Sequence, residues 1–241
     1  MPGRFEEAIE TRRRVVALTP KYSAGWSDFD STLSLIGRQT EALDCFTKAL
    51  ACDAKNLAAR LGRAMVLFKC HRVREAVVEF EAVLAKDTSQ FQARSFRLMA
   101  LNSLREISRE RLFAEHVAYG KAAGPEVRST WPNLPLESRR LRVGFLSGDF
   151  REHSVAYFIE PLLQHLDPAG FEIVLYHDHP VVDAVSSRLR KYAALWRHVA
   201  GRTDPMVESV ILADAPDVMV DLGGHTGVSR LRVFARRVGV A

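Results

Sequence analysis

Cysteine is scarce in this 241-residue chain, which has three, Cys45, Cys52 and Cys70. No two of them have the C-x-x-C spacing of a zinc or redox site, and an odd number excludes a fully paired disulfide scaffold. We therefore expect buried or half-buried free thiols, as is typical of proteins from a reducing compartment.

Long hydrophobic runs are also missing. No apolar stretch approaches the roughly 18 residues that a membrane span needs, and residues 1–10 carry acids instead of the apolar core of a secretory signal. We expect a cytoplasmic protein with no membrane partner. Hydrophobic residues still make up 47% of the chain and charged residues 26%, which is ordinary globular composition.

Neither sign of charge dominates, since 34 Lys and Arg face 29 Asp and Glu, for a net charge of +5. The positive residues form short clusters, at 12–14, 139–142 and 236–237. Nucleic acids and anionic ligands bind such clusters, but solvated surface charge is the more common explanation. We expect no nucleic-acid partner.

A repeat of 34 residues runs through the first half. Ala8, Ala42 and Ala76 are 34 residues apart, and so are Phe46 and Phe80. This is the period and residue pattern of the tetratricopeptide repeat, in which the small alanine lets neighbouring helices approach and the phenylalanine fills the space between them. The sequence predicts a tetratricopeptide-repeat helical domain over residues 1–123, with protein or peptide partners in the groove of its first helices.

The repeat departs from its consensus at several turns and helix faces. Trp26 and Gly37 occupy their usual positions in the unit 23–56, but Arg60 replaces the tryptophan of the next unit and His71 replaces its turn glycine. Apolar residues at helical spacing continue over 91–104 and 107–123. The last of these segments lacks the second-helix pattern and is expected to be a capping or docking helix.

Residues 124–140 are rich in proline and polar residues and are predicted to form a linker. Residues 141–241 then alternate between strand and helix patterns. Strands are expected at 141–147, 171–176, 196–199 and 217–222, and helices at 155–166, 184–194, 205–213 and 229–236. This alternation predicts a parallel sheet of Rossmann-like type, with ligands at the carboxyl ends of its strands.

His153 lies between the end of the first strand and the start of the first helix of this region. The amide dipoles of a helix N-terminus favour a neutral imidazole, which can accept a proton from a hydroxyl group. A histidine that only caps the helix, or packs against it, is the alternative.

A glycine-rich loop, residues 223–227, follows the last predicted strand. Glycine lets the backbone amides approach a phosphate or a sugar, and Thr226 adds a hydroxyl group. Gly224, His225 and Thr226 are therefore candidate substrate-binding residues. The loop matches no nucleotide-binding motif, and a tight strand-to-helix turn is the alternative.

Two other kinds of site are poorly supported. His177 and His179 share one face of a strand end, but their spacing nominates no third ligand, so we expect no metal site. Ser147 is not in the G-x-S-x-G context of a serine hydrolase.

Residues 141–158, 171–176 and 217–237, in this order and directly after a tetratricopeptide array, resemble the catalytic region of O-GlcNAc transferases, the family that includes the Spindly proteins. The resemblance implies a lobe of GT-B type. It also implies an inverting, metal-independent transfer of N-acetylglucosamine from UDP-N-acetylglucosamine to serine or threonine hydroxyls, with no cofactor. His153 matches the family's active-site histidine, a proposed base or sugar contact, and His225 and Thr226 lie in its donor-facing glycine loop.

In this family a second lobe carries most contacts to the uridine diphosphate, including a lysine on the phosphates. We expect residues 141–241 to be only the amino-terminal part of the catalytic region, and the chain alone to be inactive. Two alternatives remain, a non-catalytic repeat scaffold with a residual α/β domain and a fucosyltransferase of the same family.

Overall fold

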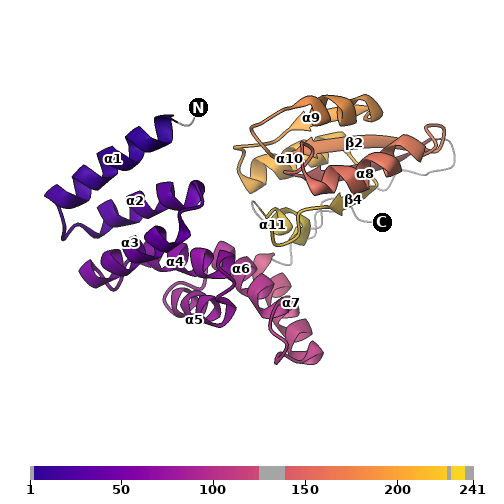
Figure 1. Cartoon of the computed structure of the whole chain (residues 1–241). Helices are drawn as coiled ribbons and strands as arrows, with labels where there is room; N and C mark the ends of the chain where they lie inside the picture. The colour runs from indigo at the N-terminus through magenta and orange to yellow at the C-terminus, as the bar shows by residue number, and fades with distance from the viewer. Residues whose placement is uncertain (1–2, 125–138, 227–228, 237–241) are drawn as a thin grey trace. The chain divides into compact units, whose positions relative to one another are not determined.

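The computed structural model describes residues 3–124, 139–226 and 229–236 (Figure 1). The chain divides into two units, Met1–His116 and Val117–Ala241. Most of the predicted linker (125–138), the last glycine of the glycine-rich loop (Gly227) and residues 237–241 lie outside the described residues.

Helices follow one another through the first unit (Figure 1). They are α1 (Gly3–Leu18), α2 (Ser23–Leu35), α3 (Gln39–Cys52), α4 (Leu57–Lys69), α5 (Val73–Leu84), α6 (Phe91–Asn102) and α7 (Arg109–Ala123), the last of which continues into the second unit. From α1 to α6 each helix packs on the next, and α4 also packs on α2 and α6, its counterparts in the neighbouring units. The predicted tetratricopeptide array is confirmed.

The repeated residues form the core of this array. Ala42 and Ala76 are completely buried, and Phe46 and Phe80 are 4% and 0% exposed. A Cβ atom on Gly62 of α4 would clash with the Phe46 ring. The two helices therefore approach closely where the pattern places small residues against a large aromatic ring.

The turn positions keep the same backbone conformation although their residues differ. Gly37 has φ of +82°, and His71, one repeat later, has φ of +58°. Glycine adopts this left-handed conformation without a steric penalty, whereas a residue with a Cβ atom does not. The repeat geometry is thus imposed on His71 by its surroundings.

Four parallel strands form the sheet of the second unit, in the order β3-β2-β1-β4. Its elements are β1 (Leu141–Ser147), α8 (Ser154–His165), β2 (Phe171–His177), α9 (Ala184–Leu189), the 3-10 turn η1 (Arg190–Tyr192), β3 (Leu195–His198), α10 (Asp204–Asp214), β4 (Val218–Asp221) and α11 (Leu231–Ala235) (Figure 1). Every strand predicted from the sequence is present. The fold class, a helical repeat array followed by an α/β lobe, is confirmed.

Helices cover both faces of the sheet. On one face, Phe145 and Leu175 pack with Ile159 of α8 and Leu189 of α9. On the opposite face, the neighbouring residues in each strand join a second core with residues of α10 and α11; its fully buried members include Val174, Tyr176, Val207, Ile211 and Val233. Apolar residues on both sides explain why these strands read as continuous hydrophobic runs.

Some details differ from the sequence-based expectations. Cys52 is exposed rather than buried, while Cys45 is buried and Cys70 is partly buried. The predicted helix 184–194 is α9 followed by the 3-10 turn η1. The two units divide inside α7, between residues 116 and 117. The predicted domain bounds, 1–123 and 141–241 with a linker between them, stay predictions.

Candidate functional site

The two loops nominated from the sequence follow neighbouring strands of the sheet. β1 and β4 are paired, with Leu146 opposite Asp221, and the Leu222 amide donates to the Leu146 carbonyl at 3.1 Å. The loop after β1 carries His153, and the loop after β4 carries Gly224, His225 and Thr226. The candidate residues therefore lie at the same carboxyl edge, where parallel α/β sheets bind ligands.

His153 is the residue that precedes α8, and its imidazole caps the helix. Nδ1 accepts a hydrogen bond from the Val155 amide at 3.3 Å and lies 3.6 Å from Oδ2 of Asp149. A neutral ring that accepts at Nδ1 carries its proton on Nε2, as inferred from this hydrogen bond. The capping alternative thus describes the observed contact, and a role in catalysis stays a prediction.

Asp183 and Ser186, which sequence reasoning missed, hold the backbone just before His153. They form the capping box of α9, in which Asp183 Oδ1 accepts from the Ser186 amide at 2.9 Å. The same carboxylate accepts from the Glu152 amide through Oδ2 at 2.7 Å. These two backbone hydrogen bonds, Ser186 first, lower the pKa of Asp183 below its usual range. The Asp-x-x-Ser spacing indicates the helix cap, but it does not indicate the hydrogen bond from the Glu152 amide to the same carboxylate.

The glycine-rich loop is organised around Asp221. Its carboxylate accepts from the Gly223 amide at 3.0 Å and from the Gly224 amide at 2.7 Å. Gly224 has φ of +54°, and Thr226 Oγ1 donates to the Gly223 carbonyl. Because these two amides are engaged by an anionic side chain, the loop is better suited to sugar hydroxyls than to a phosphate.

His225 contacts an aromatic ring of its own unit. The rings of His225 and Tyr119 meet edge to face, with centroids 4.8 Å apart, and Tyr119 is 7% exposed. Such T-shaped pairs fix ring orientation and contribute about 0.5–1.5 kcal/mol. The C-terminal part of α7 thereby orients a nominated substrate-binding residue.

Arg230 forms the most buried ion-pair network described at this edge of the sheet. Its Nε donates to Asp178, just after β2, at 2.7 Å, and its Nη1 donates to Asp204, at the start of α10, at 2.8 Å. Arg230 is 7% exposed, and the pairing, with Asp178 the larger cause, raises its pKa. This network could not be predicted from local sequence patterns, because Arg230 is 52 residues from Asp178 and 26 residues from Asp204.

His177 and His179 differ in burial, and each forms a hydrogen bond with the backbone of Val181. His177 is completely buried, and its Nε2 donates to the Val181 carbonyl at 3.0 Å. Burial, the largest cause, lowers the pKa of His177 and so favours the neutral ring. His179 Nδ1 instead accepts from the Val181 amide at 3.1 Å. Within the described residues, no group of three or more His, Cys, Asp or Glu side chains could hold a metal ion.

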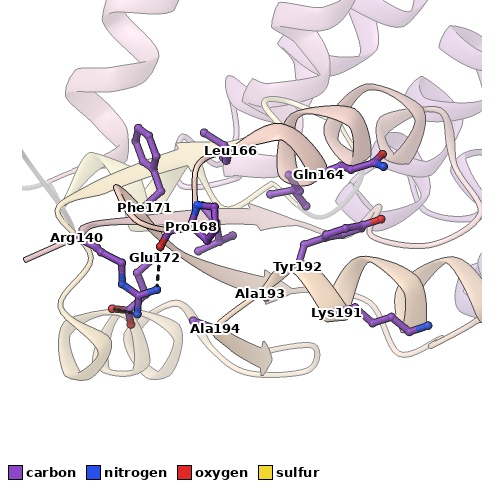
Figure 2. Close-up of a pocket in the computed structure, with 12 residues that line it drawn as sticks. Arg140, Gln164, Leu166, Pro168, Phe171, Glu172, Lys191, Tyr192, Ala193 and Ala194 are labelled. Carbon is purple, nitrogen blue, oxygen red and sulfur yellow. Dashed lines mark hydrogen bonds and ion pairs between the residues drawn. The ribbon is translucent and has the colours of Figure 1, made fainter.

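A pocket of about 360 Å³ lies at the opposite edge of the sheet (Figure 2). Arg140, which precedes β1, and Phe171 and Glu172, which begin β2, are among its lining residues, and Arg140 lies 3.6 Å from Glu172. Since this is the amino-terminal edge of the strands, the pocket is separate from the candidate site.

None of the described helices is long and apolar enough to span a membrane.

The chain combines a helical repeat array with a parallel α/β lobe, and two loops at the strand ends of that lobe carry the candidate residues. This is an O-GlcNAc-transferase-like arrangement. The comparisons with known proteins confirm the resemblance. No family model matches the chain. Over 148 residues it is 35% identical to the "Probable UDP-N-acetylglucosamine--peptide N-acetylglucosaminyltransferase SPINDLY" of Solanum lycopersicum, an alignment that covers 58% of this chain. The protein of the same name from Oryza sativa subsp. japonica is 33% identical over 168 residues, or 67% of this chain.

A solved structure extends the similarity to nearly the whole chain. A mutant form of the Thermobaculum terrenum O-GlcNAc transferase matches 98% of this chain with a TM-score of 0.86 and 26% sequence identity. The chain spans 16% and 18% of the length of the two SPINDLY relatives and 46% of the solved transferase. These relatives are named as glycosyltransferases, which supports an enzyme of this kind by resemblance.

Proposed function

We propose that this chain provides the repeat array and the first α/β lobe of a protein O-GlcNAc transferase. The reaction moves N-acetylglucosamine from UDP-N-acetylglucosamine to a serine or threonine hydroxyl of a protein or peptide bound in the repeat groove. The match over 98% of the chain to an O-GlcNAc transferase is the observation that carries this proposal. The position of His153 and the glycine-rich loop at one sheet edge supports it.

The proposed transfer is a single inverting displacement that uses no metal. The acceptor oxygen bonds to the anomeric carbon as the bond from that carbon to the diphosphate breaks, and the electron pair leaves with UDP. The acceptor's proton passes to a base. Enzymes stabilise the charge of such a leaving group with fixed cations and dipoles, which the family places in a second lobe.

His153 has two possible roles in this reaction, and the ring's protonation distinguishes them. While Nδ1 accepts from Val155, the neutral ring presents Nε2–H and acts as a hydrogen-bond donor to the sugar or the leaving oxygen. To accept a proton at Nε2, the ring has to carry its other proton on Nδ1, where Asp149 is the nearby acceptor. The observed contact favours the donor role.

The sugar donor is proposed to meet the loop after β4. The Asp221 carboxylate already accepts hydrogen bonds from the amides of Gly223 and Gly224. This loop is therefore expected to contact sugar hydroxyls through Thr226 and His225, while the phosphates bind outside the loop. The described residues of the second unit hold one four-stranded α/β lobe. We therefore expect the 241-residue chain to bind the donor weakly and to transfer no sugar at a measurable rate.

Saturation-transfer NMR of the chain with UDP-N-acetylglucosamine tests the proposal. Enhancement is expected on the sugar protons, and His153→Ala and Thr226→Ala should each weaken it, while Ser187→Ala, on an exposed face of α9, should not. Binding of GDP-fucose in preference to UDP-N-acetylglucosamine would support the fucosyltransferase alternative. Binding of acceptor peptides with no response to either nucleotide sugar would support the scaffold alternative and contradict the proposal. A radiolabelled-donor assay with measurable transfer would contradict the expected inactivity.

A further inference from the structure

The loop that carries His153 is attached to the start of α9 through two residues that are 31 apart in the chain. The Glu152 amide donates to Oδ2 of Asp183 at 2.7 Å, and Glu152 directly precedes His153. A hydrogen bond from a backbone amide to a carboxylate is stronger than one between neutral groups. The backbone on the amino-terminal side of His153 is therefore held by a charged partner.

A second hydrogen bond reinforces this attachment. Ser186 is completely buried, and its hydroxyl group donates to the Phe150 carbonyl at 2.6 Å. Phe150 itself is completely buried in the core beside α8 and α9. The α9 capping box, Asp183 and Ser186, thus contacts backbone groups at two of the three residues before His153.

Helix capping alone does not require these contacts. Oδ1 of Asp183 already caps α9 by accepting from the Ser186 amide, and an N-cap needs one acceptor. Oδ2 is used for Glu152 instead. On the other side of His153, the ring's own Nδ1 accepts from Val155. The imidazole therefore lies between two fixed backbone points, one of which α9 supplies.

We infer that Asp183 and Ser186 are positioning residues, which set the location of the His153 imidazole at the carboxyl edge of the sheet. The inference deepens the proposed function, because it rests on His153 acting at the donor site. Neither residue is placed in contact with substrate. Their effect passes through the backbone of residues 150–152 to the ring.

The decisive variant is Asp183→Asn, which separates helix capping from loop attachment. Asparagine caps a helix about as well as aspartate. Its one carbonyl oxygen cannot accept from both Ser186 and Glu152 with the observed geometry, and its charge is gone. Ser186→Ala removes the bond to Phe150 and also the hydrogen bond from the Asp183 amide to the Ser186 hydroxyl, and it serves as a second variant. Ser187→Ala is the control, because its exposed hydroxyl donates to the backbone carbonyl of Asp183, the N-cap of α9, and not to the Asp183 carboxylate or the loop before His153.

Amide hydrogen exchange and the imidazole signals of His153 are measured by NMR on the full chain. In Asp183→Asn, exchange of the Glu152 amide should accelerate about tenfold or more, the scale of one charge-assisted hydrogen bond. The His153 ring signals should shift, while thermal unfolding and the exchange of β1 and β2 amides stay as in Ser187→Ala. A purely structural role would change the unfolding curve and leave the ring signals alone.

Two results overturn the inference. One is an unchanged Glu152 amide in Asp183→Asn, and the other is faster Glu152 exchange without any change at the His153 ring in either variant. UDP-N-acetylglucosamine binding is measured on the same samples. If the ring signals respond as expected but no donor binds to the unmodified chain, the proposed function fails and the positioning of His153 stands.

Discussion

At the scale of single residues, His71 shows how strongly the repeat determines backbone conformation. It occupies the turn position that Gly37 occupies one repeat earlier, and both have positive φ. A residue with a Cβ atom in this region costs about 1–2 kcal/mol. Glycine avoids that cost but gives the unfolded chain extra freedom, worth about 0.5–1 kcal/mol. The steric cost of positive φ is therefore larger than the entropic cost of glycine.

His71→Gly is therefore expected to stabilise the chain by about 0.5–1 kcal/mol, measured by urea unfolding followed by circular dichroism. The imidazole of His71 is exposed, and no side-chain hydrogen bond of His71 is described, so the substitution breaks none of the described hydrogen bonds. Gly37→Ala is the matched change in the opposite direction and should destabilise by about 1 kcal/mol. A loss of stability in His71→Gly would show that the histidine side chain matters more than its backbone strain.

At the scale of elements, Arg230 joins three segments at the carboxyl edge of the sheet. Its guanidinium connects the start of α11 to Asp178 after β2 and to Asp204 at the start of α10. Removing one partner of a buried ion pair leaves an uncompensated charge and costs about 3–5 kcal/mol, whereas an exposed pair contributes about 0–1 kcal/mol.

Arg230→Met, which keeps the apolar stem, should lower the free energy of unfolding by about 3–5 kcal/mol in urea titrations. Arg188→Met is the matched control. It breaks a pair with Glu160 in which the arginine is 48% exposed, and should cost less than about 1 kcal/mol. Equal, small losses in both variants would mean that Asp178 and Asp204 are solvated or neutralised without Arg230.

The order and type of the elements could be predicted because each one repeats a local pattern. The 34-residue period identified the helix pairs, and buried strands such as Leu141–Ser147 read as apolar runs ended by glycine and polar residues. Helix ends were less accurate. The predicted helix after Asp183 tightens into a 3-10 turn at Arg190, and Arg230, which the prediction placed inside the helix 229–236, is the residue that precedes α11.

The candidate site was predictable only in part. Strand-end position nominated His153 and the glycine-rich loop, and the parallel topology does place both at one edge. The contacts that shape them are long-range. Asp183 is 31 residues from Glu152, and Arg230 is 52 residues from Asp178. Sequence spacing carries no information about such pairs until the strand order is known.

At the scale of the whole molecule, each unit has its own core. One cluster of buried residues, from Ile9 to Val66, lies entirely in the repeat array, and two others cover the two faces of the sheet. α7 belongs to both units. Glu115 pairs with Arg97 of the array, whereas Tyr119 contacts His225. The unit boundary therefore falls within a helix, where the residue pattern does not change and the boundary cannot be predicted from the sequence.

The position of this boundary leads to a prediction about truncated chains. A fragment of residues 1–116 should show one cooperative helical transition with the same midpoint as residues 1–124, because Tyr119 and Ala123 pack within the second unit. Residues 1–102 should melt lower, since they lack Glu115, the partner of Arg97, and leave α6 as an uncapped end of the array. Circular dichroism melts of the three fragments measure these midpoints and distinguish an array that ends at residue 116 from one that ends at residue 123. A clearly lower midpoint for 1–116 than for 1–124 would place the end of the helical domain at residue 123, where the sequence put it.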